Sequence, residues 1–257
     1  MTTKKYELTE ETLEWKGHIL HRIKALRDFD YIKAGNVGGW VESEDNLSQY
    51  GDCWVSCEAK VYGDAKVFQD AHVFDEAQVY DHAQVYGNAK VFQNAQVYGF
   101  VWFFGDARAY GAARIFDNAE IFGKTKIFDE AQVYNNAHVG GNTEVGGNAE
   151  VYGGVLICDE AKVYDNAKIY GNVQVGGNAE IGRNAEVKEM GDYKVFQNIW
   201  SSGRWFTWTR SNDKWKVGCF YGTGEELIKK AYADGELKGK CYETIVQMQN
   251  KISELLK

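Results

Sequence analysis

An uninterrupted six-residue repeat occupies more than half of the chain. An apolar residue, usually Val or Ile, recurs at every sixth position from Val55 to Val187, through 23 consecutive hexads without an insertion. Four positions after each lies a small residue, usually Ala, and Gly, Asn and Asp are common just before it. β-Branched residues suit a pleated, buried strand, whereas Gly, Asn and Asp tolerate the left-handed backbone of a tight corner. The repeat therefore predicts short buried strands joined by tight corners.

Three hexads would form one triangular coil, so the repeat would wind through nearly eight coils. Strands of successive coils would hydrogen-bond at a spacing of about 4.8 Å, and each coil would contact only its neighbours. The absence of Pro from the sequence agrees with this arrangement, because a central strand cannot lose a backbone donor. We therefore expect an all-β fold, a parallel β-helix of about eight coils.

The repeat also carries a resemblance to a known family. Its hexads, such as Val85-Tyr86-Gly87-Asn88-Ala89, resemble those of the hexapeptide-repeat superfamily over about 138 of the 257 residues. The resemblance implies a left-handed β-helix. Segments outside the repeat, Leu20–Leu26, Gly38–Glu42 and Gly218–Thr223, are similar to uncharacterised bacterial and prophage hexapeptide proteins, some of which are labelled as acyltransferases. This likeness implies a bacteriophage origin and a location in the bacterial host cytoplasm.

The flanks predict a cap at each end of the β-helix, because open ends would expose unpaired strand edges. We expect an N-terminal β cap over residues 1–54, the repeat over residues 55–192, and a small C-terminal α+β domain over residues 193–257.

Short strands are expected in both flanks. The N-terminal cap would hold two, over residues 18–27 and 29–48, with a turn at Gly35–Gly39. The C-terminal domain would contain a three-stranded sheet and two helices. Its expected strands cover residues 193–200, 204–210 and 214–221, and its helices run from the Thr223–Glu226 capping box to about Ala233 and from about Gly239 to the chain end.

Negative charge is concentrated in the repeat. The chain carries a net charge of −8, and residues 55–192 hold 11 Lys and Arg against 20 Asp and Glu, a net charge of −9. Because nucleic-acid binding needs basic surface, it is not expected along the β-helix. A basic partner, mimicry of nucleic acid, or simple solubility of a long β surface remain open. The sequence has no stretch near the roughly 18 apolar residues of a membrane span and no apolar signal core in residues 1–15, so we expect no membrane role and a cytoplasmic location.

Aromatic residues follow many of the buried positions and would point outward. On one face they recur once per coil and should stack from coil to coil. This expected interface ladder comprises Tyr62, Tyr80, Tyr98, Phe116, Tyr134, Tyr152 and Tyr170. An exposed apolar stripe of this size suggests contact with another copy of the chain, which predicts a homo-oligomer, either a dimer or a trimer.

Two hexads lack the usual polar corner. Val97–Trp102 and Val151–Leu156 are separated by three whole coils, so both irregularities fall at the same corner. They would bring large apolar side chains onto one face, with His138 and a bare-backbone notch at Gly140 between them. This face is our candidate site for a ligand or a subunit contact. Its candidate residues are Phe100, Trp102, Phe104, Phe122, Gly140, Leu156 and Cys158.

His138 is the candidate catalytic residue. The resemblance implies a histidine general base at a subunit interface, with the acyl carrier lying along the coils. Gly140 and Gly146 beside it would let a substrate approach the backbone. However, no loop interrupts the coils, whereas acyltransferases of this family commonly extrude one to build the site. His72, expected to face outward, and His82, expected at a corner, do not complete the three-histidine set of the hexapeptide carbonic anhydrases, so we expect no metal.

Three functions remain open at this point. The leading interpretation is a non-catalytic, oligomeric binding protein without a cofactor, in one version a prophage protein that neutralises a host factor or a small signal molecule. The second is an acyl-CoA-dependent acyltransferase that uses His138 and acetyl-CoA. The third is a structural or polymer-forming protein, although the expected caps argue against end-to-end growth.

Overall fold

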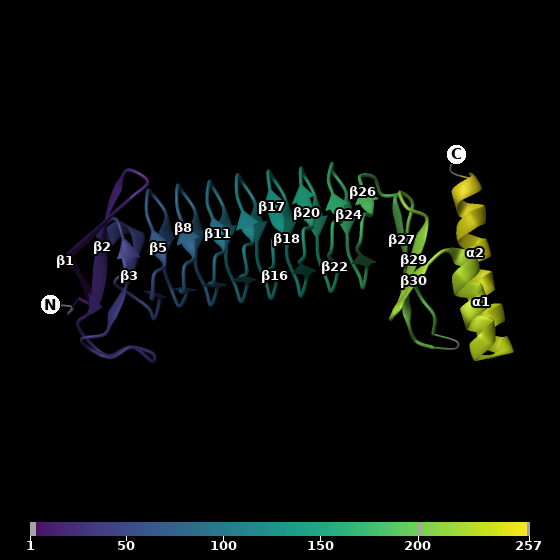
Figure 1. Ribbon diagram of the computed structural model, residues 1–257, viewed down its shortest axis with the longest axis horizontal. Coiled ribbons are helices and arrows are strands. Elements are labelled where there is room, and N and C mark those ends of the chain that lie inside the picture. Colours follow the sequence, from purple (N-terminus) through teal and green to yellow (C-terminus); the bar gives the residue numbers. More distant parts are fainter. Residues whose placement is uncertain (1–3, 200–201, 256–257) are drawn as a thin grey trace.

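The computed structural model describes residues 4–199 and 202–255 and shows an elongated molecule (Figure 1). Antiparallel strands lie at the N-terminal end, parallel coils occupy the middle, and a second antiparallel sheet and two helices lie at the other end. The prediction of a parallel β-helix of about eight coils is confirmed.

Three parallel sheets form the sides of the coils, and every third strand belongs to the same sheet. The first face contains β5 (Lys60–Val61), β8 (Gln78–Val79), β11 (Gln96–Val97), β14 (Arg114–Ile115), β17 (Gln132–Tyr134), β20 (Glu150–Tyr152), β23 (Lys168–Ile169) and β26 (Glu186–Val187). The second face contains β4 (Trp54–Val55), β7 (His72–Val73), β10 (Lys90–Val91), β13 (Arg108–Ala109), β16 (Lys126–Ile127), β19 (Glu144–Val145), β22 (Lys162–Val163) and β25 (Glu180–Ile181). The third face contains β6 (Lys66–Val67), β9 (Gln84–Val85), β12 (Trp102–Phe103), β15 (Glu120–Ile121), β18 (His138–Val139), β21 (Leu156–Ile157) and β24 (Gln174–Val175).

The core of the coils is the set of residues that the repeat predicts. Each of the 23 apolar residues from Val55 to Val187 is at most 1% exposed, and the small residues after them are buried as well. Since each strand contributes one inward side chain, these residues form one continuous core along the axis.

Each corner of the repeat contains one residue with left-handed backbone, two positions after the buried residue. Glycine adopts this backbone at Gly63 (φ 67°), and aspartate adopts it at Asp81 (φ 58°). The carboxylate of Asp81 also accepts a hydrogen bond at 3.2 Å from the backbone N–H of Gly99, one coil later. Asp129 and Gly147 make the same contact at 3.2 Å. An aspartate corner therefore satisfies a backbone donor of the next coil, which a glycine corner cannot do.

Antiparallel strands close the N-terminal end. β1 (Tyr6–Trp15) pairs with β2 (His18–Ala25), which in turn pairs with β3 (Val37–Val41). β1 is absent from the prediction because Tyr6 is its single fully buried residue, so its sequence carries no clear alternation.

β3 already belongs to the coils, which therefore begin before the regular repeat. Val41 pairs in parallel with Val61, whereas a coil of three regular hexads would bring Ala59 opposite it; from Val55 onward, the strands pair at the regular spacing. A turn does occur at Ala34 and Gly35 (φ 90°), but the predicted turn over Gly35–Gly39 is too long, because β3 includes its last three residues. The predicted strand over residues 29–48 is reduced to β3. A short 3-10 helix, η1 (Glu44–Asn46), follows.

The C-terminal sheet has four antiparallel strands instead of the expected three. Its strands are β27 (Tyr193–Gln197), β28 (Trp205–Thr209), β29 (Lys214–Val217) and β30 (Phe220–Gly222). A turn at Gly218 (φ 56°) divides the predicted last strand in two. Thr223 and Glu226 form the predicted capping box of α1 (Gly224–Asp234), and α2 (Glu236–Leu255) follows. Residue 200 of the predicted first strand and residues 256 and 257 of the predicted last helix lie outside the described residues.

Side-chain hydroxyl groups from the C-terminal sheet reach the last strands of the coils. The hydroxyl of Thr207 accepts a hydrogen bond at 2.9 Å from the backbone N–H of Glu180 in β25. On the third face, the hydroxyl of Tyr193 donates to the carbonyl oxygen of Gln174 in β24 at 3.0 Å. These bonds replace partners that a further coil would have supplied, and so they protect the strand edge.

Candidate functional site

A row of four side chains crosses the third face on consecutive coils. The strand register pairs Trp102 of β12 with Glu120 of β15, Glu120 with His138 of β18, and His138 with Leu156 of β21. Each of these residues directly precedes the buried residue of its hexad, so its side chain points outward. The two irregular hexads do bring Trp102 and Leu156 onto one face, as their spacing predicts.

Exposed apolar side chains on the coils gather at this row. Over residues 55–187, which are described without a gap, the exposed large apolar side chains are Phe100 (61%), Trp102 (51%) and Leu156 (36%). Phe100 and Leu156 are the direct result of the irregular hexads, since regular hexads place polar residues at these positions. These three side chains, with Glu120 and His138 between Trp102 and Leu156, define a surface here called the Trp102 patch.

A close histidine–carboxylate pair lies inside the Trp102 patch. Nδ1 of His138 is 2.9 Å from a carboxylate oxygen of Glu120, and about half of the His138 side chain is exposed. Because Nδ1 faces the carboxylate, Nε2 is the ring nitrogen that remains for a ligand or partner. Glu120 is missing from the sequence prediction. It lies one coil before His138 in the sequence, so the length of a coil is the signal that would have identified it.

The bare-backbone notch predicted at Gly140 does not exist. The ring of Phe122, one coil earlier, lies over this glycine, and Gly140 is buried. Phe122 also stacks on Phe104, with ring centroids 5.7 Å apart. Cys158, one coil further, is half-buried, and this burial, reinforced by the charge of Asp159, raises the pKa of its thiol. Phe104, Phe122 and Cys158 thus form the half-buried column beside the exposed row.

A hollow adjoins the patch at the N-terminal side. His82 stacks on Phe100, with ring centroids 4.5 Å apart, and its Nδ1 lies 3.2 Å from the carboxylate of Asp64. These corner residues, Trp102 and η1 line an open cavity of about 550 Å³. The sequence indicates the corner position of His82 but gives no sign that η1 would form a wall opposite it.

The predicted interface ladder is a continuous stack. Its seven rings have centroid separations of 4.7–5.2 Å and are parallel to within 9°. Tyr62 is buried at one end and the other rings are half-buried. Burial raises the pKa of Tyr134 to about 12, with the charge of Glu150 adding to the effect. The rings therefore stabilise neighbouring coils, and their role as a subunit interface stays a prediction.

His72 does not face solvent, in contrast to the prediction. Tyr31, from the segment between β2 and β3, stacks on it with ring centroids 5.4 Å apart, and its hydroxyl lies 3.2 Å from Nδ1. Burial lowers the pKa of this imidazole, although Asp30, 3.6 Å from Nε2, opposes the shift. His72 is thus part of the N-terminal packing and lies on the second face, away from His138.

Within residues 4–199 and 202–255, no group of three or more His, Cys, Asp or Glu side chains is arranged to hold a metal ion. In the same part of the chain, no helix is both long enough and apolar enough to cross a bilayer.

Comparisons with known proteins agree with the repeat. A family model described as the YdcK beta solenoid repeat matches residues 83–99. The Escherichia coli (strain K12) protein named "Uncharacterized acetyltransferase YdcK" is 37% identical over 60 residues, which cover 20% of this chain and 18% of that relative. The chain therefore matches less than a fifth of the relative's length. Together with the parallel coils, these matches are consistent with the hexapeptide-repeat superfamily.

Proposed function

We propose that the protein is a binding protein that recognises another protein through the Trp102 patch. The observation that carries this proposal is the distribution of exposed apolar side chains on the coils. Those of Phe100, Trp102 and Leu156 are the large ones exposed over residues 55–187, and all belong to this patch. A concentration of exposed apolar side chains on one part of a surface is typical of an interaction site.

The chemistry of the patch suits a protein partner. Trp102 and Leu156 are three coils apart, or about 14 Å at the usual strand spacing, so a partner that contacts both must present an extended surface. Tryptophan is the residue type most enriched among side chains that dominate binding energy. The Glu120–His138 pair between them offers hydrogen-bonding groups that can fix the orientation of a partner.

Charge favours a basic partner. The coils carry a net charge of −9 over residues 55–192, so two copies pressed face to face would repel each other, whereas a basic protein would be attracted. A basic host protein of a bacterial cell is the version that the prophage resemblance suggests. Oligomerisation stays a separate prediction, which sedimentation velocity over a range of concentrations tests.

The experiment compares the wild-type protein with Trp102→Ala and with a control, Tyr50→Ala. Tyr50 is 73% exposed and lies outside the patch, so its loss removes an aromatic side chain without touching the site. A protein captured from a bacterial extract is identified, purified and titrated by calorimetry. We expect Trp102→Ala to weaken its binding by about 30-fold or more, which corresponds to about 2 kcal/mol, and Tyr50→Ala to leave it unchanged. Equal affinity for both variants would refute the proposal.

A second function, acyl transfer, is favoured by the Glu120–His138 contact. Glu120 would hold the imidazole so that its free nitrogen removes a proton from an acceptor hydroxyl or amine. That acceptor would attack the thioester carbonyl of acetyl-CoA, and the CoA thiolate would leave and take up a proton. A relative named as an acetyltransferase makes this candidate worth testing.

The test of acyl transfer measures release of free CoA thiol from acetyl-CoA with panels of amines and hydroxyl compounds. Turnover that His138→Gln abolishes and Glu120→Gln reduces by about 100-fold or more would support this candidate. Turnover that survives both substitutions would refute acyl transfer at this site. Absence of turnover with the wild-type protein, while the partner still binds, would also refute it and leave binding as the remaining function.

A further inference from the structure

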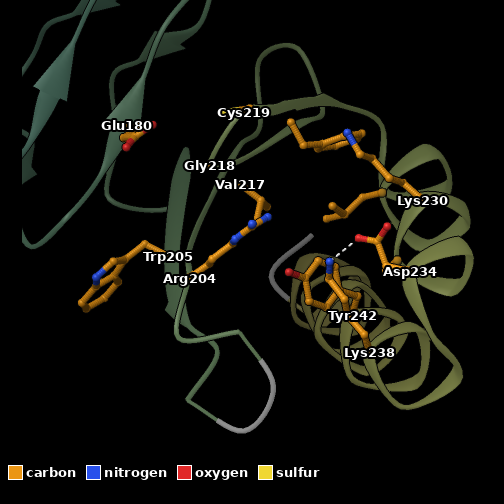
Figure 2. Close-up of a pocket in the computed structure, with 13 residues that line it drawn as sticks. Glu180, Arg204, Trp205, Val217, Gly218, Cys219, Lys230, Asp234, Lys238 and Tyr242 are labelled. Atoms are coloured by element: carbon orange, nitrogen blue, oxygen red, sulfur yellow. Dashed lines mark hydrogen bonds and ion pairs between the residues drawn. The ribbon is translucent and has the colours of Figure 1, made fainter.

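A cavity lies in the C-terminal part of the molecule, between the four-stranded sheet and the two helices (Figure 2). Its volume is about 280 Å³. Arg204 lies directly before β28, Lys230 belongs to α1, and Lys238 belongs to α2, so three separate segments bring a cation to it. Figure 2 shows the Arg204 side chain extending from the sheet toward the helices.

The inner wall of the cavity is apolar. Val217 is 1% exposed, Leu227 is 2% exposed, and both belong to the core that joins the sheet to the helices. Tyr242 adds a buried ring, whose hydroxyl donates to the Ser202 hydroxyl at 3.2 Å. A ligand that enters this cavity would therefore meet apolar carbon at the bottom and charged groups at the rim, as in most small-molecule sites.

The charges at the rim do not cancel. Of the two carboxylates that line the cavity, Asp234 is paired with Lys238, and Glu180 is 3.6 Å from Lys216. No salt bridge to Arg204 or to Lys230 occurs among the residues that the structure describes. Two positive charges at the cavity thus lack a close counter-ion.

The lowered pKa of Asp234 agrees with an excess of positive charge at the cavity. Its pKa is lowered, first by the hydrogen bond and charge of Lys238 and then by the charges of Lys230 and Arg204. All three cations therefore act on one small region, and the local potential is positive.

The distribution of charge along the chain also favours anion binding at the C-terminal end of the molecule. Residues 193–257 contain 11 Lys and Arg against 7 Asp and Glu, a net charge of +4, whereas residues 55–192 carry −9. Anions are therefore repelled by the coils and attracted to the C-terminal part.

From these observations we propose that the C-terminal cavity binds a small organic anion with an apolar body and one carboxylate or phosphate group. The apolar body lies against Val217 and Leu227. Arg204, whose planar guanidinium matches a carboxylate or phosphate with two parallel hydrogen bonds, and Lys230 hold the anionic group. Because the cavity meets the coils only at Glu180 of β25 and shares no residue with the Trp102 patch, this site is independent of the proposed protein-binding function.

The experiment titrates the full-length protein by calorimetry with three probes of similar size: phenyl phosphate, benzoate and benzyl alcohol. We expect both anions to bind and the neutral alcohol to bind at least about tenfold more weakly, since charge-assisted hydrogen bonds supply the difference. Whichever anion binds with the higher affinity shows whether the site prefers a phosphate or a carboxylate group. Equal binding of all three probes, or no binding of either anion, would overturn the proposal.

Two variants on neighbouring residues of α1 make a matched control. Lys230→Gln removes a cation at the cavity, whereas Lys229→Gln removes the same charge from a side chain outside it. We expect Lys230→Gln and Arg204→Gln each to weaken binding of the anions by about tenfold or more, and Lys229→Gln to change it by less than about twofold. All three side chains are exposed, so the folded state tolerates the changes. An equal loss in Lys229→Gln and Lys230→Gln would reduce the effect to net charge and refute the site.

Discussion

The ring of Phe122 lies where a side chain on Gly140 would have to be. A Cβ atom on Gly140 would approach the Cε2 atom of Phe122 to 2.2 Å. The same relation joins Phe128 to Gly146, at 2.3 Å from Cζ. A glycine in these columns thus lets the aromatic ring of the preceding coil lie flat on the backbone. The glycines that the sequence presents as openings are closed by their neighbours.

This relation predicts that Gly140→Ala destabilises the protein. The ring of Phe122 would have to move within a packed column, which costs about 1–3 kcal/mol of unfolding free energy. Chemical denaturation of Gly140→Ala, Phe122→Ala and the double variant measures it. In the double variant the added cost of Gly140→Ala should disappear, because the ring is gone. A cost that persists there would mean that the backbone, and not the ring, requires glycine.

The aromatic ladder predicts that loss of a ring costs more stability in the middle of the stack than at its end. Tyr134 stacks on Phe116 and on Tyr152, whereas Tyr170 stacks on Tyr152 alone among these rings. Each hydroxyl donates to a glutamate at 3.4 Å, so the two tyrosines make the same polar contact, although that of Tyr170 is more exposed. Tyr134→Ala should therefore lower the unfolding free energy by about 0.5–1.5 kcal/mol more than Tyr170→Ala. Equal losses in denaturation curves would show that stacking adds little to the burial of the rings.

His72 predicts a loss of stability in mild acid. Burial lowers the pKa of His72 in the folded protein below its ordinary value of 6.5. Between these two values the unfolded chain binds more protons, so the stabilisation is complete above about pH 6.5 and decreases as the pH falls toward the folded-state pKa. From about pH 7.5 to about pH 5.5, the unfolding free energy should fall by no more than about 1.4 kcal/mol per pH unit on account of this group.

The control for this pH dependence is His82, an exposed corner histidine. His72→Gln should flatten the dependence of the melting temperature on pH, whereas His82→Gln should retain it. A slope that is the same in the wild-type protein and in His72→Gln would assign the acid effect to other groups.

Thr207 predicts a role for the hydroxyl groups at the end of the coils. It is 2% exposed, and Thr207→Val would leave the backbone N–H of Glu180 without its acceptor. The cost should be about 1–3 kcal/mol, and hydrogen exchange of the Glu180 amide should accelerate. Thr244→Val, which removes an exposed hydroxyl from α2, should change stability by less than about 0.5 kcal/mol. Unchanged exchange at Glu180 would contradict this role.

The coils could be predicted because each position of the hexad has one structural task. A residue such as Val133 is buried at the same point of its hexad as every other such residue, and Gly or Asp occupies most of the left-handed corners, with Gln93 and Arg183 among the exceptions. The ends depend instead on pairing between segments without a repeat. The register of β1 on β2, and the longer first coil from Val41 to Val61, follow from contacts that no periodic pattern records.

The candidate site could be predicted in part for a similar reason. The position of a residue on a face follows from counting, so Trp102 and Leu156 come together as expected. The direction of a side chain along the axis does not follow from counting. Phe122 leans over Gly140, and Glu120 reaches His138, and each contact joins residues on neighbouring coils.

The register of the third face has a consequence for any partner that binds there. Backbone hydrogen bonds, such as that from His138 N–H to the Val155 carbonyl oxygen at 2.8 Å, fix the separation of Trp102 and Leu156 independently of loops. Such a face repeats the same backbone geometry about every 4.8 Å along the axis. If every coil were alike, a partner could shift by one coil along the axis and bind almost equally well. The two irregular hexads differ from all the others, so they break the symmetry of the repeat and define a single register for the partner.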